Sequence, residues 1–171
     1  MKDLVLACSL QRAYFHETGT LYFGEKAEIY KQRLVEYFKE LNPNDYQIIF
    51  LREIHQPDDK FYMDRKSGSI VGSNDVEILE IFKPYAKLIV NTNRYSGFYK
   101  TPLDSELNKI KPNKIHIVGV ETHTNVLFTA EELRNRNYAV VVHEPLVTSA
   151  EDFMHNTGIN VLSNVLSVEV D

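Results

Sequence analysis

Hydrophobic residues gather in six short runs along the chain, separated by longer stretches of mixed character. Each run is rich in Val, Ile and Leu, and several are almost continuously apolar. Such runs are typical of strands that are covered on both faces in a parallel sheet. The pattern therefore predicts six strands, at residues 4–9, 46–51, 86–91, 114–119, 138–143 and 165–170.

Between these runs, apolar residues recur at spacings of three and four, which is the period of an amphipathic helix. The pattern is clearest from Ala27 to Leu41, and the polar sequence NPND then ends that helix. The spacing predicts five helices, at residues 27–41, around 76–82, from 101 onward, at 124–135 and at 151–163.

Two of these helices carry signals at their ends. The helix around 76–82 is expected to end before Pro84, because proline removes a backbone donor. Thr101 is expected to be an N-cap, with Pro102 at the first helical position and Asp104 three residues after the cap.

Six strands alternating with five helices predict one domain over residues 1–171, a three-layer α/β/α fold with an open, mainly parallel sheet. Ligands of such sheets bind at the carboxyl ends of the strands. The segments to search are therefore those that follow the first four strands: CSLQRAYF, REIHQPDDKF, NTNRYSGF and GVETHTN. Because no glycine-rich dinucleotide or P-loop motif follows any strand, no cofactor is expected.

Composition narrows the classes of function. The 171 residues include 19 basic and 24 acidic side chains, a net charge of −5 that does not favour binding to nucleic acid. No apolar run approaches the ~20 residues of a membrane span, and the N-terminal segment lacks signal-peptide features, so a cytoplasmic location is expected. The single cysteine, Cys8, cannot form an internal disulfide and is expected to be a buried, inert thiol.

Taken together, the four strand-end segments resemble the isochorismatase-like cysteine hydrolases, a family that includes nicotinamidases. Members typically carry D-x-Q-x-x-F, D-x-H, K-x-x-x-S-x-F and G-V-x-T-x-x-C-V after their first four strands. This chain has SLQRAY at Ser9, EIH at Glu53, TNRYSGF at Thr92 and GVETHTNV at Gly119. The likeness runs through nearly the whole chain, and it implies an isochorismatase-like, Rossmann-like fold.

The resemblance assigns the family's catalytic aspartate, lysine and cysteine to positions that carry other residues here: Ser9, Thr92 and Asn125. In the family, the cysteine attacks an amide carbon, the aspartate moves its proton and the lysine supports both charges. A serine does not ionise near neutral pH, a threonine carries no charge, and a carboxamide is not an amide-cleaving nucleophile. The resemblance therefore predicts that the family's cysteine hydrolase activity is absent.

Other positions of the family pattern remain. Gln11, Tyr14, Glu121 and Thr122 are expected to line the pocket or the oxyanion site, with Tyr14 standing where the family has phenylalanine. Family members also place a cis peptide bond after the Gly-Val pair, here between Val120 and Glu121. The resemblance further implies a small polar ligand in the strand-end crevice and a homo-oligomer, dimeric or larger.

A metal site is a separate question. In nicotinamidases the D-x-H pair and a further histidine bind a divalent cation, and Glu53 and His55 stand at the pair here. The downstream stretch QPDDKFYMD has no histidine, so Glu53 and His55, with Asp58 or Asp59, are weak candidates for an oxygen-rich ion. The competing interpretation makes His55 a solvated loop residue, and no bound metal is expected.

Two interpretations of function stay open. In the first, the protein is a pseudoenzyme that keeps the family fold and acts by binding or assembly; a structural partner without a ligand would look the same in sequence. In the second, it is a divergent hydrolase of a small amide or related molecule that uses relocated residues such as Ser9 and His123. Thr92 and Glu121 would then lie near that pair at the strand ends.

Overall fold

The computed structural model describes residues 2–65 and 68–171. Its elements follow one another in the order β1 (Asp3–Cys8), α1 (Arg12–Phe15), α2 (Glu25–Glu40), β2 (Tyr46–Glu53), α3 (Lys60–Arg65), η1 (Asn74–Val76), η2 (Glu80–Tyr85), β3 (Ile89–Thr92), α4 (Leu103–Ile110), β4 (Ile115–Val120), η3 (Thr122–Val126), α5 (Leu127–Asn135), β5 (Val140–Thr148), α6 (Asp152–Asn164) and β6 (Glu169–Val170).

The six strands form one sheet in the order β3-β2-β1-β4-β5-β6, and every neighbouring pair is parallel. The predicted six-stranded α/β fold is therefore confirmed. The chain runs outward in one direction through β2 and β3 and in the other through β5 and β6, so the order reverses between β1 and β4. In open parallel sheets a crevice forms at such a reversal, at the carboxyl ends of the two strands.

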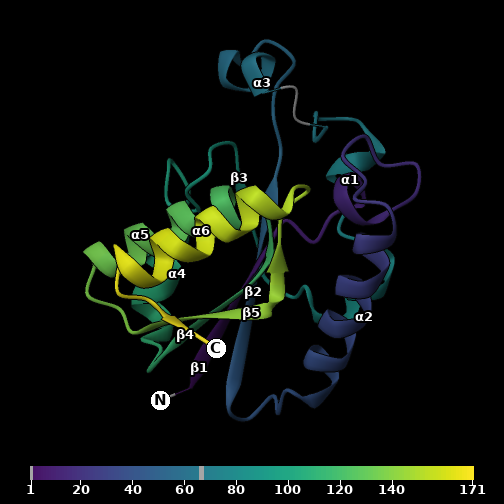
Figure 1. Ribbon diagram of the computed structural model, residues 1–171. Coiled ribbons are helices and arrows are strands. Elements are labelled where there is room, and N and C mark those ends of the chain that lie inside the picture. Colours follow the sequence, from purple (N-terminus) through teal and green to yellow (C-terminus); the bar gives the residue numbers. More distant parts are fainter. Residues whose placement is uncertain (1, 66–67) are drawn as a thin grey trace.

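Helices cover both faces of the sheet, with α4, α5 and α6 on one side and α1 and α2 on the other (Figure 1). Alternate residues of each strand point to opposite faces. In β1, Leu4, Leu6 and Cys8 pack with α4, α5 and α6, while Val5 and Ala7 pack with α1 and α2. Burial on both faces explains why the central strands β1 and β4 appear in the sequence as nearly continuous apolar runs.

The segment around residues 76–82 departs from the predicted α-helix. It consists of two 3₁₀ helices, η1 and η2, and Pro84 lies inside η2 instead of after it. Between them the chain is extended, because Arg12 N donates to Glu77 O at 2.9 Å and Leu79 N donates to Leu10 O at 3.0 Å. These bonds to the loop after β1 interrupt the helical pattern.

Two helix starts also differ from the sequence predictions. Helix α4 begins at Leu103 with Pro102 as its N-cap, although the Thr101 hydroxyl still accepts a bond from Leu103 N at 3.2 Å. The predicted helix at 124–135 begins instead as one turn of π-helix, η3, and continues as α5 from Leu127. The same turn carries Asn125, so its wider geometry shapes the predicted site.

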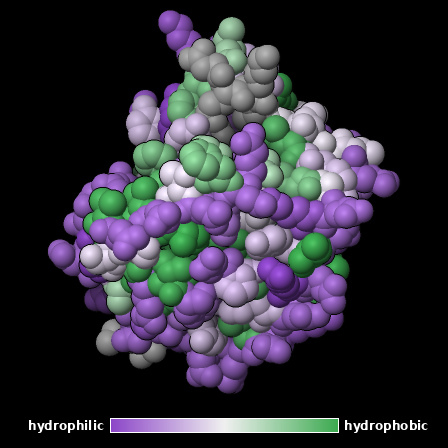
Figure 2. All heavy atoms as spheres, in the orientation of Figure 1, coloured by the Kyte–Doolittle hydropathy of each residue, from purple (hydrophilic) through white to green (hydrophobic). Residues whose placement is uncertain are grey.

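On the face shown in Figure 2, hydrophobic side chains lie in groups that are interrupted by hydrophilic ones. Exposed large hydrophobic residues come from several elements and include Met63, Tyr99, Phe128 and Phe153. Among the described residues, no helix combines the length and the apolar character needed to cross a membrane.

Candidate functional site

The first candidate residue, Ser9, directly follows β1 and is fully buried. Its backbone adopts a left-handed conformation, with φ of 51°, which is uncommon for a residue other than glycine. Its N–H donates to Leu51 O of β2 at 2.9 Å. The chain therefore turns sharply at the end of β1 while Ser9 stays attached to the sheet.

The turn after β4 brings Asn125 to the same place. Gly119 near the end of β4 has φ of 110°, and a Cβ there would lie 2.1 Å from Cys8 O, so only glycine fits this close approach of β4 to β1. The peptide bond between Val120 and Glu121 is cis, as the resemblance predicted. The η3 turn follows at once and carries Asn125, which is 5% exposed.

Ser9 and Asn125 meet directly across the β1/β4 junction. Asn125 Nδ2 donates a hydrogen bond to Ser9 Oγ at 2.8 Å. Two buried polar atoms of the η3 turn, Asn125 Oδ1 and Thr124 Oγ1, have no hydrogen-bond partner within the described part of the chain. Burying a polar atom without a partner costs about 1–3 kcal/mol, so these two atoms set this junction apart from an ordinary satisfied turn.

Thr92, the third candidate, lies on the same edge of the sheet but apart from this pair. It ends β3, pairs with Glu53 in the β2 ladder and is buried. Strand β2 separates β3 from β1. No hydrogen bond among the described residues joins the Thr92 side chain to Ser9 or Asn125, so the structure brings two of the three predicted positions into contact.

Gln11 and Tyr14, which the sequence predicts to line the pocket, both bind Glu53 at the end of β2. Gln11 Nε2 donates to Glu53 O at 2.8 Å, and Glu53 N donates to Gln11 Oε1 at 2.6 Å. Tyr14 Oη donates to Glu53 Oε2 at 2.6 Å. All three side chains are buried, so this network fixes the loop after β1 against the end of β2.

His55 is not the solvated loop residue that one interpretation of the sequence described. It is 1% exposed, and its Nε2 lies 2.7 Å from Glu53 Oε1. Its ring packs near Phe61 and Tyr62, with centroids 6.3 and 5.5 Å away. The carboxylate of Glu53 draws His55 inward, because a buried carboxylate needs hydrogen-bond donors.

The metal question depends on what Glu53 and His55 already bind. Their side chains are directed to each other, and His55 Nδ1 lies 3.8 Å from Asp59 Oδ2. Asp59 in turn pairs with Arg94 at 2.7 Å, and this hydrogen bond lowers the pKa of the Asp59 carboxyl. Among the side chains that the structure describes, no three His, Cys, Asp or Glu residues are grouped as metal ligands.

The three residues before Thr124 bind the segment that follows β5. Glu121 Oε1 accepts from Ala150 N at 3.3 Å, Thr122 Oγ1 lies 2.9 Å from His155 Nδ1, and His123 Nδ1 lies 2.8 Å from Ser149 Oγ. The histidine of the suggested Ser9 and His123 pair therefore binds a different serine. Searching the end of the fifth strand as well as the first four would have drawn attention to Ser149.

Cys8 is the only cysteine of the chain and lies in the apolar core between the sheet and α4–α6. Burial raises the pKa of its thiol to about 12. The predicted burial of the thiol is confirmed.

Comparison with known proteins agrees with this architecture. The isochorismatase domain family matches residues 3–170, so the chain belongs to the isochorismatase family. A relative is the "uncharacterized isochorismatase family protein PncA" of Bacillus subtilis (strain 168), which is 23% identical over 181 residues, covering 99% of each chain.

Solved structures share the fold across the whole chain. The nicotinamidase/pyrazinamidase PncA from Bacillus subtilis aligns with a TM-score of 0.86 and 24% identity over 99% of both chains. The N-carbamoylsarcosine amidase from Thermoplasma acidophilum aligns with a TM-score of 0.88 and 22% identity, over 100% of this chain and 96% of that one. At these identities the similarity shows the fold alone.

Proposed function

We propose that this chain is an isochorismatase-family protein without the family's hydrolase triad, which acts by binding a small polar ligand at the β1/β4 junction. In this proposal, Ser9, Thr92 and Asn125 stand at the positions of the catalytic aspartate, lysine and cysteine. Fold alone does not determine function, so the chemistry of these side chains carries the proposal.

The hydrogen bond between Asn125 and Ser9 is the observation that carries it. A carboxamide donating to a hydroxyl is a neutral pair that holds neither an acid nor a nucleophile activated by a base. An amide hydrolase needs both a nucleophile and a group that moves its proton. Among the described residues, the bond to Ser9 Oγ is the one hydrogen bond that the Asn125 side chain makes.

The thiol chemistry of the family has no substitute elsewhere in this chain. Cys8 is buried on the α4–α6 side of the sheet, and burial raises its pKa to about 12. A thiolate is the nucleophilic form of cysteine, so this thiol supports no cysteine hydrolase activity at neutral pH.

The unpaired atoms of the η3 turn favour a ligand-binding role over a purely structural role without a ligand. Asn125 Oδ1 and Thr124 Oγ1 are buried without a partner among the described residues. A ligand with hydrogen-bond donors would satisfy them and recover part of their desolvation cost. The alternative, a hydrolase that pairs Ser9 with His123, has no support from the hydrogen bonds, because His123 binds Ser149.

The test combines turnover with binding. We expect no ammonia release from nicotinamide, pyrazinamide or N-carbamoyl compounds, and we expect Asn125→Ala and Ser9→Ala to abolish binding of any small amide that shifts the thermal midpoint of the protein. Ser105→Ala, at an exposed position of α4, is the control. Ammonia release that follows the protein through purification and disappears in Ser9→Ala would contradict the proposal.

A dimeric or larger assembly and a cytoplasmic location belong to the same proposal, through the family resemblance. Light scattering coupled to size exclusion tests the assembly. A monomer across the micromolar range would remove that part of the proposal and leave the ligand site unaffected.

A further inference from the structure

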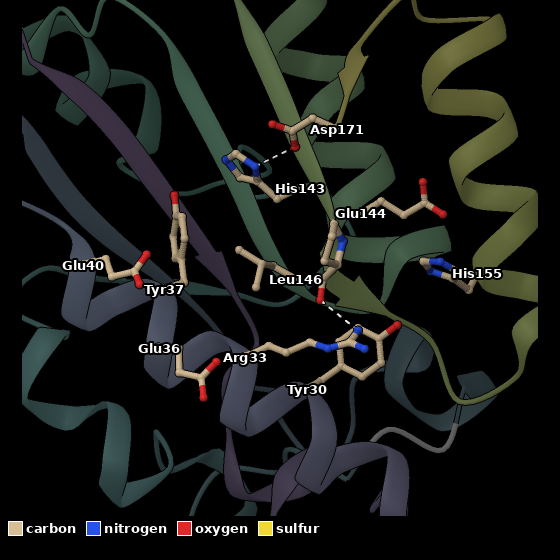
Figure 3. A pocket seen from close by; sticks show the side chains of 11 residues that line it. Tyr30, Arg33, Glu36, Tyr37, Glu40, His143, Glu144, Leu146, His155 and Asp171 are labelled. Carbon is tan, nitrogen blue, oxygen red and sulfur yellow. Dashed lines mark hydrogen bonds and ion pairs between the residues drawn. The ribbon is translucent and has the colours of Figure 1, made fainter.

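A second cluster of titratable side chains lies away from the β1/β4 junction, on the face of the sheet that α2 covers. His116 of β4 and His143 of β5 project to this face, beside the residues that pack with α2. His143 also lines a cavity of about 940 Å³ between α2 and the irregular middle of β5. Figure 3 shows His143 directed toward Asp171 at one end of this cavity, with Tyr37 nearby.

Four side chains form a continuous row. His116 Nε2 lies 3.3 Å from Asp3 Oδ2, His116 Nδ1 lies 2.9 Å from His143 Nε2, and His143 Nδ1 lies 2.7 Å from Asp171 Oδ1. The two ring planes differ by 3°, with centroids 5.1 Å apart. Since the centroids are much farther apart than the facing nitrogens, the rings lie edge to edge in one plane, joined by a nitrogen–nitrogen hydrogen bond.

Counting protons shows that this row is one proton short if both histidines are neutral. Each outer nitrogen faces a carboxylate, which only accepts, so each outer nitrogen must carry a proton. A neutral imidazole has a single N–H. Two neutral rings would therefore present two lone pairs to each other across 2.9 Å, and a third proton between them removes that conflict.

We propose that His116 and His143 together form a binding site for one exchangeable proton, held between their facing nitrogens and enclosed by Asp3 and Asp171. The two carboxylates more than offset the single positive charge, so the row as a whole keeps one negative charge. The carboxylate side chains are 26% and 52% exposed, while the histidines are 12% and 17% exposed. The row connects the start of β1, the middle of the sheet and the residue after β6.

The surroundings indicate which ring carries the charge. Burial lowers the pKa of His143, against the opposing effect of Asp171, so the proposal assigns the neutral state to His143, with Nδ1 donating to Asp171 at 2.7 Å. His116 then carries both N–H groups and donates to Asp3 and to His143. Desolvation would raise the pKa of Asp3, but hydrogen bonds from Asn113 and His116 lower it, which fits a cationic neighbour.

Other titratable groups face the pair or share its cavity. Burial raises the pKa of Tyr37, whose ring centroid lies 5.5 Å from that of His143, so its phenol is neutral. Further groups among the described residues are Tyr46 of β2, Glu169 of β6 with its partner Lys114, and Tyr30, Arg33, Glu36, Glu40, Glu144 and His155 around the cavity. Acidic groups outnumber basic ones there, which favours a positive charge on the pair.

The sign of the pH dependence follows from the proton count. Above about pH 6.5, an unfolded histidine is mostly neutral, so the folded protein holds one more proton than the unfolded chain and stability falls as pH rises through the release of that proton. Below about pH 6.5, both His116 and His143 become protonated in the unfolded chain. In the folded protein the lowered pKa of His143 disfavours the second of these protons. Stability therefore falls on the acid side as well.

Nitrogen NMR of the full-length protein tests the proposal directly. In two-bond ¹⁵N–¹H spectra near pH 7, we expect His116 to show two protonated nitrogens and His143 to show one, at Nδ1. His116→Gln and His143→Gln provide the assignments, and His16→Gln, outside the row, is the matched control. Two singly protonated rings at pH 7 would overturn the proposal, whatever the variants do.

Denaturant unfolding at a series of pH values provides the second measurement. We expect the unfolding constant of the natural protein to rise with pH, by up to tenfold per pH unit while the proton leaves, and expect this rise in His16→Gln but not in His116→Gln. Equal slopes in His16→Gln and His116→Gln would contradict the proposal. So would stoichiometric zinc uptake that both row variants lose, since the facing nitrogens would then bind a metal in place of the proton.

Discussion

Two neighbouring regions at the carboxyl ends of the strands, the end of β2 and the β1/β4 junction, differ in how their buried polar side chains are hydrogen-bonded. At the end of β2, the Glu53 carboxylate is bound by Tyr14 and His55, and Gln11 bonds to its backbone. At the β1/β4 junction, Asn125 and Ser9 are neutral and share one hydrogen bond, while Asn125 Oδ1 is buried without a partner among the described residues. The first region holds a charged side chain whose two carboxylate oxygens are both hydrogen-bonded, although His55 Nδ1 beside it is also buried without a partner among the described residues. The second region is neutral, and its unpaired atom is the carboxamide oxygen of Asn125.

The difference separates architecture from candidate function. A buried charge with its donors in place stabilises the fold only as long as every partner remains. An unpaired buried atom adds no stability, and a binding site is one setting in which such an atom has a use. We therefore interpret the end of β2 as a support and the β1/β4 junction as the ligand site.

We expect the largest loss of stability when the buried carboxylate of Glu53 is removed. Glu53→Ala leaves the Tyr14 hydroxyl and the His55 ring buried without their shared acceptor, and we expect it to lower the free energy of unfolding by about 3–5 kcal/mol. Urea unfolding measures this, with the exposed Glu17→Ala as the control. A cost below about 1 kcal/mol would show that the β2 network is not a structural support.

An intermediate effect is expected from the backbone that joins the two strands. Gly119→Ala would place a Cβ 2.1 Å from Cys8 O, whereas the same change at Gly72 meets no atom within 4 Å. Both glycines have positive φ, so Gly72→Ala controls for backbone conformation. We expect Gly119→Ala to cost about 1–3 kcal/mol more than Gly72→Ala in thermal unfolding. Equal costs would mean that β4 need not approach β1 so closely.

The smallest effect is expected at the candidate site itself. Asn125→Ala removes one hydrogen bond and also removes an unpaired atom, so we expect a loss of about 1 kcal/mol or less. A double-mutant cycle with Ser9→Ala should give a coupling of about 0.5–1.5 kcal/mol, the usual value of one neutral hydrogen bond. A loss as large as that of Glu53→Ala would erase the distinction between the two regions.

The fold could be predicted from the sequence because strands that are buried on both faces appear as nearly continuous runs of apolar residues. The contact between Ser9 and Asn125 followed from the rule that strand ends converge at one edge of a parallel sheet. The burial of His55 could not be predicted, because it depends on Glu53, and a loop sequence does not show which way a side chain turns. The interruption of the helix near Ile78 had the same kind of cause, since it arises from bonds to the distant loop after β1.

The central claim is that the β1/β4 junction keeps the family's geometry and has lost only its reactive groups. The most direct test is to replace them together, as Ser9→Asp, Thr92→Lys and Asn125→Cys in a Cys8→Ala background, and to measure the pH dependence of alkylation of the new thiol. A helix N-terminus and a nearby lysine both favour a thiolate, so the account predicts a midpoint at least about one unit below 8.5, the value for an ordinary thiol. A midpoint near about 8.5 in a folded variant would contradict it.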